Sequence, residues 1–328
     1  MPMNGTCLAR ARDRLEERRA ENEVLRQRRE REIYLRIPRV QEIDQRLQRQ
    51  MVRLFGLTLR HGQDPTEELR ALEQSNLALQ AERAELLKAA GFPADYTDPV
   101  CTCSRCQDKG YLPDGSICEC LTTLYNAELT RDLSTLLQTG NERFDAFDLS
   151  LFDEPARSQM ARTLKVCRTF AEDFAPGAPN LLLQGGTGLG KTFLSGCIAR
   201  TVAQQGYTVA YESAATALGF FETAKFQRNS EAGERAAAKV EEYLRCDLML
   251  LDDLGTEMIS PYSVSALYTL INHRLSLEKT TVISTNLDDD ALRRSYSPQI
   301  LSRLEGSYIT LHFTGRDIRQ VRKERGML

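Results

Sequence analysis

A glycine-rich segment at 185–192 has the residue types that bind the phosphates of a nucleotide. Its residues are Gly185, Gly186, Thr187, Gly188, Leu189, Gly190, Lys191 and Thr192. Because an apolar run precedes it and a helical pattern comes after it, the segment has the context that a P-loop requires. Glycines let successive backbone amides point at phosphate oxygens, and the following helix contributes its positive N-terminal end. We therefore expect ATP to bind here, with Lys191 bridging the β- and γ-phosphates and Thr192 coordinating Mg²⁺.

Two adjacent carboxylates, Asp252 and Asp253, come directly after a mainly apolar run at 247–251. A strand that ends in carboxylates is typical of the Walker B element of P-loop proteins. Asp252 at the strand tip is expected to hold the Mg²⁺ shell, and Asp253 to polarise the water that attacks the γ-phosphate. Aspartate is one methylene shorter than the glutamate that many related proteins place there, so slow turnover is expected.

Three more polar residues occur in an order that suits nucleotide hydrolysis. Asn286 comes after the apolar run 281–285 and is a candidate to position the attacking water. Arg303 lies before the last expected strand, from which a guanidinium can reach the γ-phosphate of a neighbouring subunit. Arg319 is placed to contact phosphate in its own subunit. Taken singly, each arginine would more often be a surface residue, but the order after a P-loop favours function.

Five of the nine cysteines fall between Cys101 and Cys120. Cys103 and Cys106 form one pair and Cys118 and Cys120 a second, and four thiolates suit a closed tetrahedral Zn²⁺ site. One alternative uses Cys101 with Cys103 as the first pair. A second alternative is an iron–sulfur cluster, because thiolates alone do not discriminate sharply between metals. The remaining cysteines are scattered and are expected to be core or surface residues.

The elements that must position these residues change character along the chain. From residue 180 onward, short apolar runs alternate with helical stretches, which predicts an α/β fold with a parallel sheet. The expected strands are 180–184, 207–211, 247–251, 280–285 and 308–313. A helix is expected around 121–138, and after it an aromatic segment that either packs against the core or walls the adenine pocket. Core packing is favoured for its residues Phe144, Phe147 and Phe152.

Residues 8–90 are rich in Arg, Glu, Leu and Gln, which favours long helices, and three are expected. The first should end near Ile37, because Pro38 suits the first turn of the next. Asp64 and Pro65 resemble the start of a third helix, which Gly91 would end. The third helix has an interrupted heptad pattern. The pattern indicates either an intramolecular hairpin or a partner-binding or oligomerising coiled coil, and a partner-binding hairpin is favoured. Its apolar positions are Leu69, Leu72, Leu79 and Leu86, and Asn76 and Arg83 interrupt them.

Composition limits the classes of function. A 41% hydrophobic and 27% charged chain is typical of a globular protein. The net charge of −3 gives no overall attraction to DNA or to an anionic membrane, so any nucleic-acid contact must use a local patch. The sequence lacks an apolar run long enough for a membrane span and the start of a signal peptide, so a cytoplasmic protein is expected, in which clustered cysteines indicate a metal more than disulfides.

Taken together, these motifs resemble those of the AAA+ bacterial helicase loaders of the DnaC and DnaI type, whose near relative is the transposition ATPase IstB. The resemblance covers residues 140–325, and its matching blocks are 184–199, 248–257, 282–287, 302–304 and 315–319. It implies a five-stranded sheet in the order 5-1-4-3-2, with Asn286 as sensor 1, Arg303 as arginine finger and Arg319 near sensor 2. It also implies self-association through the ATPase domain and delivery of a replicative ring helicase to single-stranded DNA. A large helical lid is expected to be absent, because the chain ends soon after its last expected strand.

The resulting division is a helical partner-binding region at 1–95, a zinc module at 96–122, a linker at 123–152 and an ATPase domain at 153–328. Cysteine blocks of this kind precede the ATPase in some loader-like proteins, so the resemblance implies a helicase-docking or DNA-touching module. The alternative function is a transposition or phage accessory ATPase that assembles on DNA. It is less favoured because residues 1–90 hold 18 basic and 15 acidic side chains, a weak excess of charge for binding duplex DNA. A metabolic P-loop kinase is disfavoured because no second phosphate-binding motif is visible.

Overall fold

The computed structural model describes residues 5–58, 66–134 and 142–327. The chain divides into two compact units, one made of Met1–Ala11 with Thr122–Leu328 and the other of Arg12–Leu121. The larger unit contains the sheet, and the smaller one contains the long helices and the cysteine cluster.

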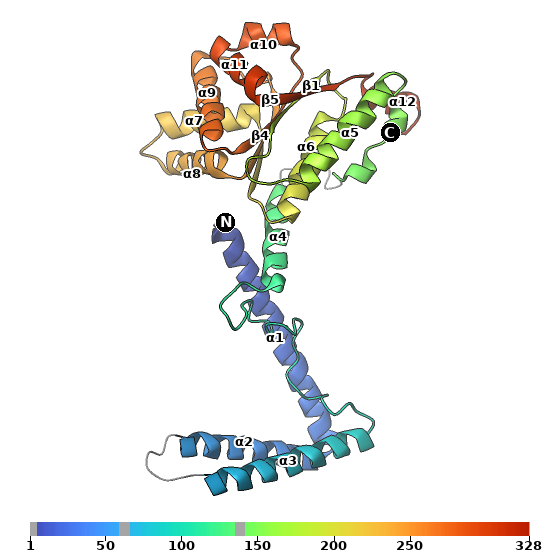
Figure 1. The fold of residues 1–328 in the computed structure, drawn as a ribbon, viewed down its shortest axis with the longest axis vertical. Helices are drawn as coiled ribbons and strands as arrows, with labels where there is room; N and C mark the ends of the chain where they lie inside the picture. Colours follow the sequence, from blue (N-terminus) through green and yellow to red (C-terminus); the bar gives the residue numbers. More distant parts are fainter. Residues whose placement is uncertain (1–4, 59–65, 135–141, 328) are drawn as a thin grey trace. The chain divides into compact units, whose positions relative to one another are not determined.

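The larger unit is built on one parallel sheet of five strands in the order β2-β3-β4-β1-β5 (Figure 1). This is the expected order 5-1-4-3-2 read from the other edge, so the expected fold is confirmed. The strands are β1 (Asn180–Gly185), β2 (Val209–Ser213), β3 (Leu248–Leu254), β4 (Thr280–Thr285) and β5 (Tyr308–Phe313).

Two strands, β2 and β3, have boundaries that differ by two or more residues from the expected ones. β2 begins two residues later than expected, at Val209. The Thr208 amide and hydroxyl both donate to Asp247 Oδ2, at 3.0 and 2.7 Å, so the Thr208 amide is not free to pair with a neighbouring strand. β3 does not end at residue 251 but continues through both carboxylates, with a register shift against β4 between Leu251 and Leu254.

Helices cover both faces of the sheet, as parallel crossover connections require. α5 and α6 lie on one face, and α7 and α9 lie on the other with α8 packed against them (Figure 1). Every residue of β4 is buried, so this central strand is a fixed support for Asn286, the next residue of the chain. The helices of this unit after residue 150 are α5 (Ala156–Glu172), α6 (Lys191–Gln204), α7 (Ala214–Phe226), α8 (Glu231–Arg245), α9 (Pro261–Ser276), α10 (Asp289–Ser295), α11 (Pro298–Ser307) and α12 (Ile318–Glu324).

The three expected helices are α1 (Gly5–Arg36), α2 (Pro38–Thr58) and α3 (Thr66–Ala89), and the expected break at Ile37 is confirmed. The smaller unit contains α2, α3 and α1 from Arg12 onward. The cap proposed at Asp64 and Pro65 lies outside the described residues. α2 and α3 pack as a hairpin, and Ile33, Val40 and Leu87 form a small core at its base.

The chain after α3 runs back along α1 towards the cysteines. The Tyr96 hydroxyl donates to Glu32 Oε2 at 3.0 Å, and the Asn22 side chain donates to Thr102 Oγ1 at 3.1 Å. A helix α4 (Glu119–Ser134) then begins within the cysteine cluster. It agrees with the helix expected at 121–138, whose last residues lie outside the described part of the chain.

Candidate nucleotide site and metal centre

The glycine-rich segment connects the end of β1 to the start of α6. Gly188 and Gly190 both have left-handed backbone, with φ of 69° and 89°. A Cβ at Gly188 would lie 2.0 Å from Asp317 Oδ1, and one at Gly190 would lie 2.7 Å from the ring of Phe147. Side chains at these two positions would be strained and would clash, so the segment needs glycine for the shape that presents its amides.

Lys191 begins α6 and its side chain is buried. Its Nζ donates to the carbonyl oxygens of Gly185 and Gly186, both at 2.7 Å, and to Asn286 Oδ1 at 2.6 Å. Burial lowers the pKa of Lys191, and the nearby Asp253 and Asp252 oppose that shift. The segment, the lysine and the residue after β4 therefore meet at one edge of the sheet, where the carboxyl ends of parallel strands form binding sites.

Asp252 is buried near the end of β3 and accepts hydrogen bonds on both carboxylate oxygens. The Tyr211 hydroxyl from β2 donates to Oδ2 at 2.8 Å, and the Ser284 hydroxyl from β4 donates to Oδ1. Both donors are neutral, so neither of them cancels the charge of Asp252. An anionic carboxylate with the Thr192 hydroxyl in the same cavity is an oxygen donor set that fits Mg²⁺.

Asp253 has a left-handed backbone, with φ of 56°, at the point where β3 shifts register against β4. Its amide donates to Ser284 Oγ at 2.9 Å, and the Asn286 side-chain amide donates to its Oδ1 at 3.4 Å. Burial and the neighbouring Asp252 raise the pKa of Asp253, while Lys191 and Asn286 oppose the rise. Strained backbone and raised carboxyl pKa values are common where a group acts as a base.

One cavity of about 610 Å³ is lined by Lys191, Thr192, Asp252, Asp253 and Asn286. The 3₁₀ segments Phe144–Ala146 and Leu149–Leu151 also contribute to the cavity wall, together with α12. Arg319 and Arg322 of α12 both line the cavity. The Ile318 amide donates to the Gly188 carbonyl at 2.9 Å, so the C-terminal helix is attached directly to the P-loop.

Both interpretations of the aromatic segment apply to different residues. Phe144 and Phe152 are buried and serve packing. Phe147 is half-buried, lines the cavity and stacks on Phe152 with ring centroids 5.8 Å apart.

Arg303 does not line this cavity. Its guanidinium donates to Asn272 Oδ1 at 2.9 and 2.6 Å and lies 4.8 Å from the centroid of the Tyr268 ring, so it is held on α9. The other sequence-predicted nucleotide residues with described side chains come together within one chain, and Arg303 is set apart from them.

Tyr211 and Arg322 are the site residues that the sequence reasoning missed. Tyr211 was visible as the end of an expected strand, but its link to Asp252 depends on β2 lying beside β3. Predicting this contact from the sequence would have required the register of β2 against β3 as well as the strand order.

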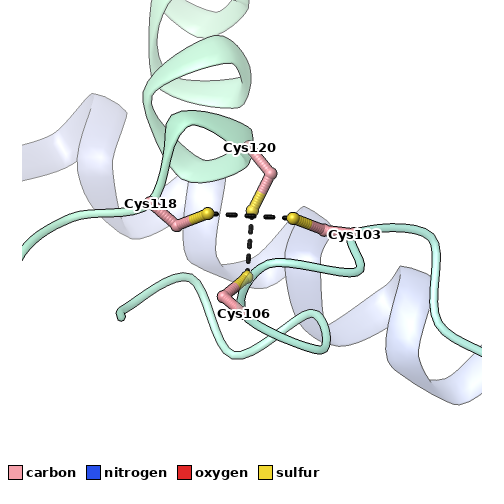
Figure 2. A group of neighbouring side chains, drawn as sticks. All are labelled: Cys103, Cys106, Cys118 and Cys120. Atoms are coloured by element: carbon pink, nitrogen blue, oxygen red, sulfur yellow. Dashed lines mark hydrogen bonds between the residues drawn. The ribbon is translucent and has the colours of Figure 1, made fainter. Parts of the chain in front are cut away.

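The four paired cysteines form a compact cluster whose sulfur atoms all lie within 4.8 Å of one another (Figure 2). Cys103 Sγ lies 3.7 Å from Cys118 Sγ, and Cys106 Sγ lies 3.4 Å from Cys120 Sγ. Tetrahedral zinc with bonds of about 2.3 Å separates its sulfurs by about 3.8 Å, so the donor set fits Zn²⁺. Cys101 is exposed and does not belong to this group.

Short-range contacts shape the loop around the cluster. The Gly110 amide donates to Cys106 Sγ at 3.3 Å, and Tyr111 forms an isolated antiparallel bridge with Ile117. The pKa of Cys103 is lowered to about 7, mainly by the backbone amide of Cys106. Donors of this kind favour a thiolate, which is the form that binds metal.

Asp108 lies inside the same loop and is only 2% exposed. It accepts the Thr102 and Cys103 amides at 2.7 and 2.9 Å and the Asn22 side-chain amide at 2.9 Å. The carboxylate therefore attaches the cysteine loop to α1.

The chain is similar in sequence to a known protein family. The family described as IstB-like ATP binding protein matches residues 133–296, which is half of the sequence. The protein belongs to this family. None of the helices among the described residues has an apolar stretch long enough to cross a bilayer.

Two relatives and one solved structure illustrate the similarity. The chain is 21% identical to the uncharacterized protein YdaV of Escherichia coli (strain K12), over 43% of this chain and 55% of that protein. It is 22% identical to the replicative helicase loader DnaC of Buchnera aphidicola subsp. Acyrthosiphon pisum (strain APS), over 48% of this chain and 64% of that protein. The chain thus spans less than two thirds of the length of either relative. A crystal structure of the DnaC helicase loader is 19% identical with a TM-score of 0.44, over 53% of this chain and 97% of that one.

Proposed function

We propose that this protein is an ATPase of DNA replication that loads a replicative ring helicase onto single-stranded DNA. The observation that carries the proposal is the convergence of Lys191, Asp252, Asp253 and Asn286 in one cavity of an IstB-like ATP-binding protein. Similarity to a replicative helicase loader supports the cellular role.

In this proposal the cavity binds ATP through the amides of residues 185–192 and through Lys191 and Arg319. Lys191 exchanges its contacts with the Gly185 and Gly186 carbonyls for phosphate oxygens, which neutralises their charge. Mg²⁺, held by Thr192 and Asp252, would supply further neutralisation of the phosphates. Asp253 accepts the proton of the attacking water, and the Asn286 amide beside it orients that water.

We propose that Arg303 acts on the nucleotide of a neighbouring subunit. It lies outside the cavity of its own chain and is already oriented by Asn272 and Tyr268. A guanidinium held in this way loses little conformational freedom when it meets a phosphate. ATP-dependent self-association through the ATPase domain is the expected consequence of this assignment.

Single-stranded DNA is the proposed nucleic-acid partner, and an exposed ring on α7 beside a half-buried ring on α9 supports it. Phe226 is 65% exposed, and its ring centroid lies 5.2 Å from that of Tyr262. Lys225 Nζ lies over both rings, at 5.6 and 4.8 Å from their centroids. Exposed aromatic rings with a nearby cation are suited to stacking unpaired bases and binding their phosphates.

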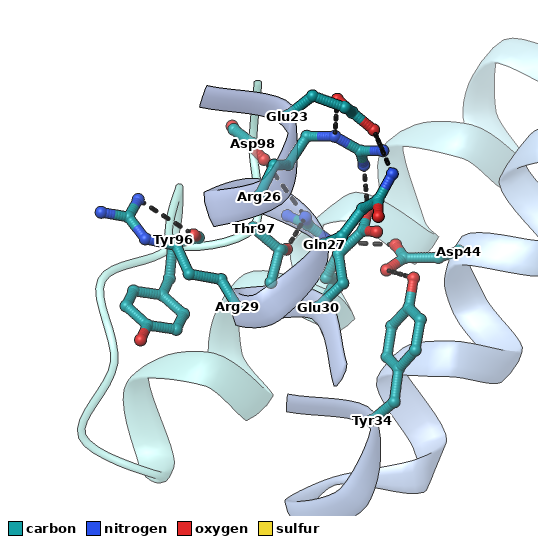
Figure 3. A network of polar contacts seen from close by, with 11 residues as sticks. Glu23, Arg26, Gln27, Arg29, Glu30, Tyr34, Asp44, Tyr96, Thr97 and Asp98 are labelled. Carbon is teal, nitrogen blue, oxygen red and sulfur yellow. Dashed lines mark hydrogen bonds and ion pairs between the residues drawn. The ribbon is translucent and has the colours of Figure 1, made fainter. Parts of the chain in front are cut away.

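For the N-terminal half, we propose that residues 1–95 dock the helicase and that residues 96–122 are a zinc module, joined by a linker at 123–152 to the ATPase domain at 153–328. The hairpin has the internal bracing that a docking arm needs. Arg83 of α3 donates to Asp44 of α2 at 3.0 Å and to Asp98 at 3.1 Å. Tyr34 of α1 donates to the same Asp44 (Figure 3). Met51 and Val52 on α2 are 59% and 69% exposed and are available to a partner.

The second candidate is a transposition or phage accessory ATPase that forms ATP-dependent assemblies on DNA. The match to the family of IstB-like ATP binding proteins supports this candidate, because IstB is a transposition ATPase.

A capture experiment separates the candidates. The tagged full-length chain is incubated with ATP and either a purified replicative helicase or a transposase, and helicase loading is then measured on circular single-stranded DNA. We expect helicase capture and loading, both reduced by Lys191→Ala. The Phe226→Ala variant should keep ATP binding and lose DNA-dependent loading. Capture of the transposase with no binding of the helicase would replace the loader proposal.

A further inference from the structure

Tyr211 lies in the nucleotide cavity with its hydroxyl directed at Asp252. The residue sits in the middle of β2, paired in register with Leu250 of β3, and its hydroxyl reaches Asp252 Oδ2 at 2.8 Å. The side chain is 7% exposed and lines the cavity beside the P-loop. It is thus placed to control the orientation of the carboxylate without being part of any motif.

We infer that the Tyr211 hydroxyl is a positioning group that fixes the Asp252 carboxylate for the Mg²⁺ of the bound nucleotide. The inference rests on the proposed ATP-binding function and adds to it a residue that determines the metal requirement.

A carboxylate near the end of a strand has torsional freedom that its neighbours must remove. Asp252 can rotate about its Cβ–Cγ bond, and this torsion has broad preferences. In this structure one oxygen accepts the Ser284 hydroxyl from β4 and the other accepts the Tyr211 hydroxyl from β2. Donors from two different strands fix the plane of the group, and each oxygen keeps acceptor capacity for water or a cation.

The chemistry of the donor matters as well as its position. A lysine or arginine at this place would neutralise the charge that attracts Mg²⁺, whereas a phenol leaves Asp252 anionic. A phenol has an ordinary pKa of about 10, so its hydroxyl carries a proton and acts as a donor at neutral pH. Partners of this kind behind a metal ligand typically change metal affinity or activity by about 10- to 100-fold when they are removed.

The ring and the hydroxyl of Tyr211 can be tested separately. The ring fills space in the core, and phenylalanine would fill it equally well. Tyr211→Phe therefore removes the contact with Asp252 and little else. Tyr296→Phe is the matched control, because Tyr296 is also buried, its hydroxyl donates to the carboxylate of Glu257, and it does not line the cavity.

The experiment measures binding of a fluorescent ATP analogue to the full-length protein as Mg²⁺ is added, so its readout does not depend on hydrolysis. In Tyr211→Phe we expect the Mg²⁺ concentration at half-maximal enhancement of binding to rise by at least about 10-fold. Binding in excess chelator should be unchanged, and high Mg²⁺ should restore the wild-type level. Tyr296→Phe should match the wild type in all three measurements.

A wild-type Mg²⁺ requirement in folded Tyr211→Phe would overturn the inference, even if its melting temperature falls. Should Tyr211→Phe not fold, 3-fluorotyrosine at this position keeps the ring and makes the hydroxyl more acidic. A shifted Mg²⁺ requirement then supports the inference and an unshifted one overturns it. Failure of the wild type itself to bind the analogue with Mg²⁺ would instead refute the proposed ATP-binding function.

Discussion

In the nucleotide cavity the functional side chains are attached to buried elements, whereas in the cysteine cluster they are attached to a loop. Lys191 begins a helix, and Asp252 and Asn286 lie at the ends of strands whose preceding residues are buried. The four cysteines lie in a segment with one isolated β-bridge and the first turn of α4. The cavity therefore has its shape from the hydrophobic core before any ligand binds, whereas we expect the shape of the cluster to depend on a bound metal.

The largest expected effect is that of removing the metal. Structural zinc contributes about 10 kcal/mol or more to small domains of this kind, whereas the cavity owes its shape to the sheet. We expect about one Zn²⁺ per chain, lost on chelation or in Cys103→Ser, together with amide protection in the cysteine loop. Binding of an ATP analogue should be unchanged, and Cys101→Ser should retain its zinc.

Elemental analysis and hydrogen exchange provide the measurements. Iron in place of zinc would contradict the zinc assignment. A cysteine loop whose amides stay protected without metal would mean that neither region depends on a ligand for its shape.

A second prediction concerns Arg303, which the preformed cavity does not contain. Arginine fingers are worth about 10³ to 10⁵ in rate in well-studied NTPases. We expect Arg303→Ala to bind ATP almost normally and to lose hydrolysis stimulated by DNA or by assembly. Because Asp253 is a short base, the loss should fall at the lower end of that range.

Mixing Arg303→Ala with Lys191→Ala tests whether the arginine acts between subunits. Each mixed interface that pairs an intact P-loop with an intact arginine should recover some activity. Mixtures as inactive as either variant alone under assembling conditions would mean that Arg303 only stabilises its own chain.

The third prediction addresses Asp253 as the base. General bases contribute about 10² to 10⁴ in rate, so Asp253→Asn should lose hydrolysis by that factor and keep ATP binding. Asparagine tolerates the left-handed backbone at this position, so the variant should fold.

The pH dependence of hydrolysis has a definite sign. The pKa of Asp253 is raised by burial and by Asp252. As the pH falls through this raised pKa, the carboxylate becomes protonated and cannot accept the proton of water. The acid limb of kcat/KM should therefore lie at higher pH than for an ordinary aspartate, and a limb in the usual aspartate range would contradict the assignment.

The two regions are alike in what the sequence could predict. The P-loop, the carboxylates and the cysteine pairs are local patterns, and the sheet order came from a resemblance carried by those patterns. The contact between Tyr211 and Asp252 joins residues 41 positions apart, and that between Asn22 and Asp108 joins residues 86 apart. Such contacts depend on which elements become neighbours, which composition and spacing do not encode.

Arg83 shows the same limit in the helical hairpin. In the heptad pattern it is an interruption of the seam, and in the structure it donates to both Asp44 and Asp98. A charged residue at an apolar position weakens a coiled-coil pattern, but here its partners lie on α2 and on the segment after α3. The role of Arg83 could be recognised only once the structure had shown where Asp44 and Asp98 lie.

The smallest expected effect comes from Asn22, which attaches the cysteine loop to α1. Its side chain donates to Asp108 Oδ2 at 2.9 Å, and Asp108 also accepts the Cys103 amide. Hydrogen bonds to charged groups are worth about 1.5–3 kcal/mol, so Asn22→Ala should loosen the loop without unfolding it. Since about 1.4 kcal/mol is a factor of ten, we expect zinc to be released to a chromophoric chelator about 10-fold faster or more.

Gln27→Ala is the matched control for this variant, because Gln27 lies on the same helix and donates to Glu23 at 2.9 Å. It should release zinc at the wild-type rate, and neither variant should change binding of the ATP analogue. Equal zinc release from Asn22→Ala and wild type would mean that the thiolates and local turns hold the metal alone. Weaker ATP binding in Asn22→Ala would show that the two regions are coupled, contrary to a cavity that is fixed by the sheet.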